Sequence, residues 1–160
     1  MKLSASIRIF FKLKKGEKGL LLEAFCYLAL ARVMVMIPFA KMVPWLGDAH
    51  AESPREIVTE KKQLKQISYF LHMVARNTPF DSKCLVRAIA ALKMLERRGF
   101  ESTLYLGTGR NEAGQLGAHA WLRCGSVYIS GSDEMDNYTI VACFHRKVKR
   151  HKDKEGWSHG

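Results

Sequence analysis

Residues 82–99 read SKCLVRAIAALKMLERRG, and this stretch decides the fold of the 160-residue chain. Ser82 is expected to cap the N-terminus of a helix, and Gly99 is expected to end it. The few polar positions between them, Lys83, Arg87, Lys93 and Arg97 among the clearest, cannot solvate one whole side. A helix this apolar is usually covered on most sides, which predicts a central helix.

Two further helices are expected before this stretch. An apolar run predicts the first from about Gly19 to Ile37, ended by Pro38. A link marked by Pro44 and Gly47 follows. The second helix should run to about Arg76. Ser53 is its expected N-cap and Pro54 its first helical residue, and apolar residues recur along it at intervals of three and four.

After Gly99 the pattern changes to short strands. Strands are expected at residues 102–106, 118–123, 127–130 and 138–144, joined as an antiparallel meander, with Gly107-Thr108-Gly109-Arg110 as a turn. Helices followed by antiparallel strands indicate an α+β fold. The expected organisation is a basic and apolar helical arm at 1–50, a catalytic domain at 51–146 and a basic tail at 147–160.

Positive charge is concentrated at the two ends of the chain. The net charge is +11; residues 1–20 hold six basic residues against one acidic, and residues 141–160 hold six against two. Such ends suit an anionic lipid surface or an acidic partner. No RNA-binding aromatic pattern, zinc finger or Gly/Arg repeat accompanies them, so nucleic acid is not expected as a partner.

Four cysteines, Cys26, Cys84, Cys124 and Cys143, are unevenly spaced, with no Cys-x-x-Cys pair. This usage indicates a reducing compartment, mostly buried free thiols and no metal site. Charged residues interrupt the apolar stretch 20–46, which makes it unlike an export signal or a spanning helix. The expected location is therefore the cytoplasm.

Cys84 is the candidate nucleophile. By the capping argument it is the second residue of the central helix, where unpaired backbone N–H groups and the positive end of the helix dipole stabilise a thiolate. The same N–H groups would face an oxyanion formed on an attacked carbonyl. A cysteine among Leu, Ala and Ile also fits as core filler, so a base from elsewhere in the chain has to complete the argument.

His119 is the candidate base, because alanines on both sides leave its imidazole accessible at the start of a strand. A third group should orient the ring. With a three-residue turn after this strand, Arg123 pairs with Val127 and Asp133 lies diagonally on the same face as His119. A two-residue turn would instead favour Ser132 or Glu134, and Asp136 is a more distant option.

These residues resemble those of a known family. Ser82-Lys83-Cys84-Leu85 with the following helix, and Ala118-His119-Ala120-Trp121, are similar to the small B-type leader peptidase of lasso-peptide biosynthesis, a transglutaminase-like, papain-related cysteine peptidase. Gly131-Ser132-Asp133 and the segment 138–144 resemble the family's C-terminal strands. The similarity spans about 12–145, and the Cys-helix and His-Ala-Trp motifs are specific only in combination.

The resemblance implies a hydrolase that cuts the leader from a ribosomally made precursor peptide. It makes Cys84 the nucleophile, His119 the base and acid, and an aspartate, by our reading Asp133, the orienting group. It requires no metal or cofactor. The implied partners are a small leader-recognition protein, which presents the precursor, and an ATP-dependent lasso cyclase, which acts on the product.

Other functions stay open on the sequence alone. A true transglutaminase would use the same three groups but transfer the acyl group to an amine. A non-catalytic scaffold would keep Cys84 as a structural residue and use the basic ends to recruit an acidic partner. The 1–46 arm has three possible roles: packing across the catalytic domain, docking partner proteins, or lying on an anionic membrane.

Overall fold

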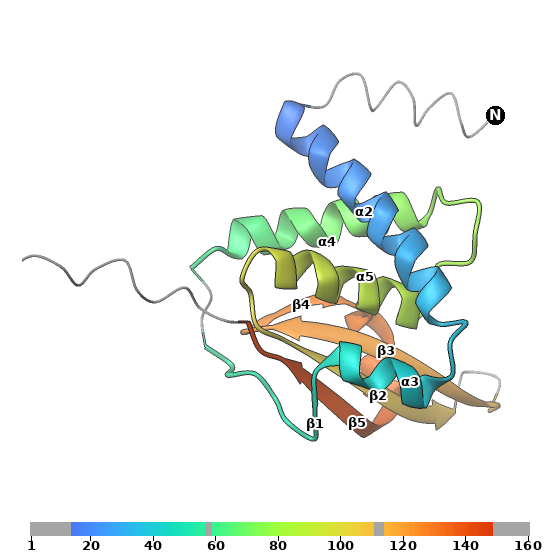
Figure 1. The fold of residues 1–160 in the computed structure, drawn as a ribbon. Coiled ribbons are helices and arrows are strands. Elements are labelled where there is room, and N and C mark those ends of the chain that lie inside the picture. Colours follow the sequence, from blue (N-terminus) through green and yellow to red (C-terminus); the bar gives the residue numbers. More distant parts are fainter. Residues whose placement is uncertain (1–13, 57–58, 111–113, 149–160) are drawn as a thin grey trace, which may run out of the picture.

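The computed structural model describes residues 14–56, 59–110 and 114–148, and shows a layer of helices against one face of an antiparallel sheet (Figure 1). This confirms the α+β prediction. The helices are α2 (Lys15–Met34), α3 (Phe39–Leu46), α4 (Lys61–Ala75) and α5 (Cys84–Arg97). The strands are β1 (Asp48–Ala49), β2 (Ser102–Arg110), β3 (Leu116–Cys124), β4 (Val127–Ser130) and β5 (Tyr138–Arg146), with a 3-10 helix η1 (Ser132–Asn137) before the last.

The strands do not form the simple meander that the sequence predicts. Their order in the sheet is β1-β5-β2-β3-β4. Strands β2, β3 and β4 are sequential neighbours, but β5 returns to the other side of β2, which is the strand order of a Greek key. Consequently η1 has to carry the chain across the end of β3, and this crossing positions the candidate site.

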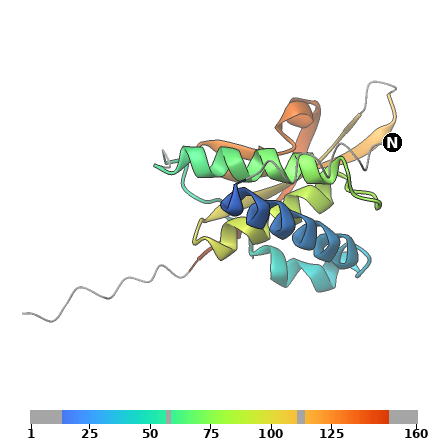
Figure 2. The same cartoon turned by 90° about the horizontal axis from the view of Figure 1, so that it is seen from above.

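Helix α5 is central, as predicted. It packs on β2, β3 and β4 on one side and against α2 on the other, and α2 in turn lies across both α4 and α5 (Figure 2). Its C-terminus ends on Gly99, at φ 76°, where the Phe100 N–H bonds to the Leu95 carbonyl and the Gly99 N–H to the Glu96 carbonyl. This Schellman motif confirms Gly99 as the end of the helix.

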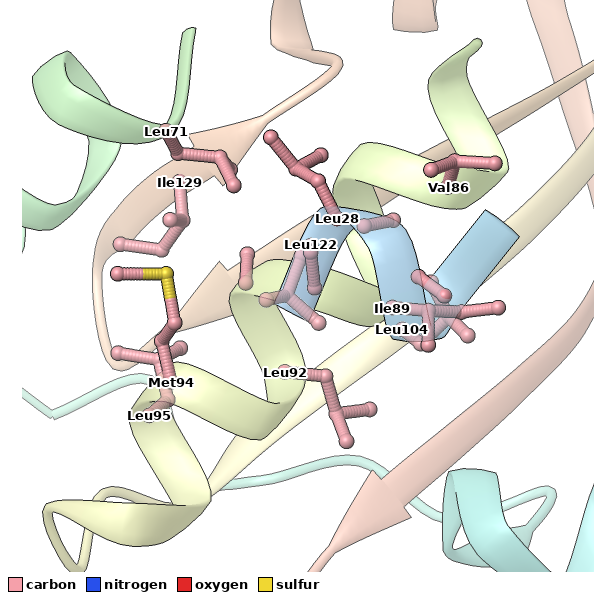
Figure 3. Packing of buried hydrophobic residues seen from close by; sticks show 14 of the residues in the cluster. Leu28, Leu71, Val86, Ile89, Leu92, Met94, Leu95, Leu104, Leu122 and Ile129 are labelled. Atoms are coloured by element: carbon pink, nitrogen blue, oxygen red, sulfur yellow. The ribbon is translucent and has the colours of Figure 1, made fainter. Parts of the chain in front are cut away.

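One hydrophobic core lies between the helices and the sheet (Figure 3). Leu28 of α2 and Leu71 of α4 reach the same cluster as Ile89 of α5 and Leu122 of β3, and all four are fully buried. Helix α2 is also tied to α5 by Arg98, which donates two hydrogen bonds to the Glu23 carboxylate at 2.6 and 2.7 Å. The described part of the N-terminal arm therefore packs across the domain.

The predicted helix start at Ser53 is wrong. Ser53 is buried beside Thr103 of β2: its backbone N–H donates to the Thr103 hydroxyl at 2.7 Å, and the two hydroxyls lie 2.8 Å apart. Residues 51–56 run as irregular chain along the sheet, and α4 starts only at Lys61. A capping pattern competes here with a tertiary hydrogen bond, and the tertiary bond prevails.

Arg123 holds this irregular segment in place. Its side chain is 1% exposed and lies on the sheet face away from α5, where its Nε donates to the Tyr105 hydroxyl at 3.0 Å. The remaining guanidinium N–H groups donate to the carboxylate of Glu52 and to the backbone carbonyls of Ser53, Pro54 and Gly125. The Tyr105 hydroxyl and the Arg123 guanidinium hold the pKa of Glu52 below its usual range.

Pro44 and the glycines at 107 and 109 also have roles other than the predicted ones. Pro44 lies inside α3, not in a link. Gly107 and Gly109 belong to β2, not to a turn. A Cβ at Gly107 would lie 2.8 Å from the indole ring of Trp121, so the glycine makes room for an aromatic ring packed on the strand.

Candidate functional site

Cys84 is the first residue of α5. The N-cap is Lys83, not Ser82, whose hydroxyl instead lies 2.9 Å from that of Thr78. The predicted position of the cysteine is thus one residue too far into the helix. Cys84 is half-buried, and its side chain packs against the edge of the helix-side core.

The surroundings of Cys84 are suited to negative charge on a bound group. The first turn of α5 contains no acidic residue, and its backbone N–H groups have no partners within the helix. Arg87, one turn further, donates its Nε–H to the Ser82 carbonyl at 2.6 Å, which keeps the guanidinium next to the helix start. An oxyanion formed at this helix end would meet N–H donors and positive charge.

His119 lies in β3 opposite Gly107 and is enclosed by aromatic rings. Its imidazole stacks against Trp121 at a centroid distance of 5.8 Å and against Tyr138 at 5.0 Å, with interplanar angles of 25° and 28°. Trp121 continues this stack onto Tyr105. The histidine ring is therefore held between flat neighbours, which restricts its rotation.

A backbone carbonyl orients the His119 ring. The Nε2 atom lies 2.7 Å from the carbonyl oxygen of Gly131, in the segment that crosses from β4 to η1. A carbonyl oxygen can only accept a hydrogen bond, so Nε2 carries the proton in neutral His119. The other ring nitrogen, Nδ1, then keeps its lone pair and is the atom able to accept a proton.

This geometry predicts the tautomer of His119 directly. In two-dimensional ¹H–¹⁵N spectra of the side chain above neutral pH, Nε2 should show the shift of a protonated nitrogen and Nδ1 that of an unprotonated one. Asp133→Asn should leave both shifts unchanged. A neutral His119 protonated at Nδ1, or a tautomer that changes in Asp133→Asn, would contradict the role of the Gly131 carbonyl.

Gly131 lies where the chain crosses from β4 to η1, and a larger side chain has no room there. Its φ is 74°, and a Cβ built on it would lie 2.4 Å from the Ala120 carbonyl oxygen and 2.9 Å from the Trp121 Cβ. The close approach to β3 is what brings the Gly131 carbonyl within reach of the imidazole. The sequence analysis missed this partner because every residue has a backbone carbonyl, so no residue type marks it. The signal that could have indicated it is a glycine directly after a strand.

Cys84 and His119 lie at the same end of the domain. Helix α5 runs antiparallel to β2, and its 14 residues span about 21 Å. At about 3.3 Å per strand residue, that length reaches from Ser102 to about Thr108, next to the pair Gly107–His119. The N-terminus of α5 and the start of β3 are therefore neighbours.

The thiol and the imidazole do not contact each other directly in this structure. Ala120 and Leu122 face α5, so the alternation of β3 places His119 on the other face with Trp121. Among the residues that the structure describes, no hydrogen bond joins Cys84 to His119. The thiol packs on the helix side and the imidazole lies on the other side, so the structure places the two groups at one end of the domain without joining them as a dyad.

Asp133 lies in η1, two residues beyond Gly131, and its side chain is exposed. The turn is not the three-residue one that favours Asp133 but the two-residue alternative: Cys124 pairs with Val127 across Gly125-Ser126, and a register shift follows before Ser130. Strand β4 then ends, and η1 takes Asp133 out of the sheet. Within the described residues, Asp133 makes no hydrogen bond to His119, so its part in catalysis stays a prediction.

The cysteines are all free, but the expectation that most are buried holds only in part. Cys124 is buried, and burial raises its pKa to about 11; Cys26 is exposed, and Cys143, like Cys84, is half-buried. The described residues contain no cluster of three His, Cys, Asp or Glu side chains that could hold a metal ion. Nor does the same part of the chain contain a helix of the length and hydropathy needed to cross a bilayer.

Comparison with known proteins gives one family match. The family model described as "Transglutaminase-like superfamily" matches residues 33–143, a span that contains Cys84, His119 and Asp133. No curated protein and no solved structure matches the chain.

Proposed function

Because this chain belongs to the transglutaminase-like superfamily, whose members typically use a catalytic cysteine, we propose that it is a cysteine peptidase that removes the leader from a ribosomally made lasso-peptide precursor. The observation that carries the proposal is the position of Cys84 at the first residue of the central helix, at the same end of the sheet as His119. The two sequence motifs around these residues support the specific substrate.

The proposed reaction has two halves. In the first, Cys84 would give its proton to Nδ1 of His119 and attack the carbonyl of the last leader residue, and the proton would then pass to the leaving amine of the core peptide. In the second, a water molecule would lose a proton to His119 and attack the thioester, which releases the leader acid and the thiol. The N–H groups at the start of α5 would stabilise the oxyanion in both halves.

The structure adds two features to this mechanism. The hydrogen bond to Gly131 leaves Nδ1 as the basic nitrogen of His119, and the stacked rings of Trp121 and Tyr138 restrict its position. For proton transfer, the thiol and the imidazole must come within about 3.2 Å. His119 lies on the sheet face away from α5, so we propose that binding of the precursor, presented by a leader-recognition protein, turns the start of β3 until the imidazole reaches the thiol. Asp133 remains our candidate for stabilising the charged imidazole.

The reactivity of the cysteines tests the proposed dyad without knowledge of the substrate. We expect iodoacetamide to modify Cys84 faster than the exposed Cys26 at pH 7, with Cys124 almost unreactive because its pKa of about 11 leaves little thiolate. His119→Ala should slow the modification of Cys84 and leave Cys26 unchanged. Mass spectrometry of each cysteine peptide against time gives the rates, with and without precursor and recognition protein.

Equal rates at Cys84 and Cys26 under both conditions would contradict the dyad. Product analysis then separates the two enzyme classes. A peptidase gives leader acid and free core amine even when a primary amine is in excess. Incorporation of that amine into the leader in place of hydrolysis would identify an acyl-transferring transglutaminase instead.

A further inference from the structure

Helix α2 exposes a continuous set of large apolar side chains on the side away from the domain. We call this set the apolar face of α2; its members are three or five residues apart, lie on one side of the helix and end in the turn that follows it. Three of its members are more than half exposed: Leu22 at 61%, Val33 at 59% and Met36 at 74%. The full set is Leu22, Phe25, Leu30, Val33 and Met36.

The opposite side of α2 is apolar as well. Ala24, Leu28, Ala31 and Met34 are buried against α4 and α5. Figure 1 shows α2 as the outermost element of the helix layer, on the far side from the sheet. A helix that is apolar on two opposite sides is normally covered on both, by protein or by lipid. An exposed apolar set of this kind marks an interaction surface.

The exposed charged side chains on the helical segment that carries this face are positive. Both acidic residues of α2 are turned to other partners: Glu23 binds Arg98 of α5, and the Glu17 carboxylate accepts a hydrogen bond from the backbone N–H of Lys14. The structure describes every residue from 14 to Gly47. In this segment the exposed charged side chains are those of Lys14, Lys15 and Lys41.

The sequence before α2 continues this pattern. Residues 1–13 read MKLSASIRIFFKL, which holds three basic residues and no acidic one, with several large apolar residues. A partner that matches both properties must offer an apolar layer next to negative charge. A bilayer with anionic headgroups offers both, since its negative surface attracts basic residues.

We propose that the apolar face of α2 docks in the plane of an anionic membrane surface. Leu22, Val33 and Met36 would enter the boundary between headgroups and acyl chains, while the neighbouring lysines would contact lipid phosphates. The contact is peripheral, since no helix in the described residues has the length and hydropathy of a membrane span. This proposal is independent of the proposed peptidase activity, and neither Cys84 nor His119 takes part in it.

Binding of the full chain to vesicles tests the proposal. We expect co-sedimentation with vesicles of phosphatidylcholine and phosphatidylglycerol, at least tenfold weaker binding to pure phosphatidylcholine, and weakening by salt. The double variant Leu22→Glu/Val33→Glu should bind the anionic vesicles at least tenfold more weakly. The matched control Leu116→Glu/Val141→Glu makes the same charge change at two other exposed apolar residues, 82% and 57% exposed, and should bind as wild type.

Circular dichroism and size-exclusion chromatography of each variant check that it is folded. No binding of wild type to anionic vesicles would overturn the proposal, as would equal binding of both double variants, which would assign the contact to the basic ends alone. A wild-type dimer that dissociates in Leu22→Glu/Val33→Glu, without vesicle binding, would show that a second copy of the chain covers this face.

Discussion

Replacing Cys84 with Ala is expected to lower kcat/KM for leader removal by about 10³-fold or more. The proposed mechanism passes through a thioester on Cys84 Sγ, and no other cysteine of the described residues lies at the start of a helix. Loss of a nucleophile removes the covalent route and leaves only the contribution of substrate binding and oxyanion stabilisation. The measurement is cleavage of the precursor in the presence of the recognition protein, followed by mass spectrometry.

The matched control is Cys26→Ala, which removes an exposed thiol and should keep the wild-type rate. Thermal unfolding of both variants should show that Cys84→Ala remains folded, since removing one half-buried sulfhydryl group loses little packing. Cleavage by Cys84→Ala at an undiminished rate would reject Cys84 as the nucleophile and favour the scaffold function.

Replacing Arg123 with Met is expected to lower the free energy of unfolding by about 1–3 kcal/mol or more, the cost of leaving buried polar groups without a partner. The variant leaves the carbonyls of Ser53, Pro54 and Gly125 without their guanidinium donor. Methionine fills a similar volume, so the loss comes from unpaired polar groups more than from a cavity. Urea unfolding followed by circular dichroism gives the difference.

Arg55 provides the control, because it contacts the same carboxylate from the surface. Its guanidinium lies 3.7 Å from Glu52, and its side chain is 67% exposed. Arg55→Met should change the free energy of unfolding by less than about 1 kcal/mol, as exposed ion pairs usually contribute little. If Arg123→Met were as mild as Arg55→Met, the network would not anchor the segment that precedes α4.

The parts of the fold that local sequence determines were predictable. The central helix needs only its apolar composition and Gly99, and each predicted strand overlaps an observed one. The position of β5 was not predictable, because nothing in a strand's own residues states which neighbour it pairs with. Ser53 shows the same limit: the capping pattern is local, whereas Thr103, its actual partner, is 50 residues away.

The candidate site follows the same division. Cys84 and His119 can be selected from their types and their places at element ends, and the topology puts them at one end of the domain. The group that orients His119 cannot be selected in this way, because its position depends on a turn length and a register shift and the group itself is a backbone carbonyl. Counting residues across a turn is sensitive to a single inserted residue, since each one moves the pairing along the strand.

The place of β5 in the sheet has a consequence for how the protein is made. This strand is synthesised after β1, β2, β3 and β4 but lies inside the sheet, between β1 and β2. Until the ribosome has released it, β2 has an unpaired edge of nine residues that can pair with another chain. A nascent or truncated chain that stops before Tyr138 would therefore be prone to aggregate, and the cell would have to shield that edge until β5 has been made.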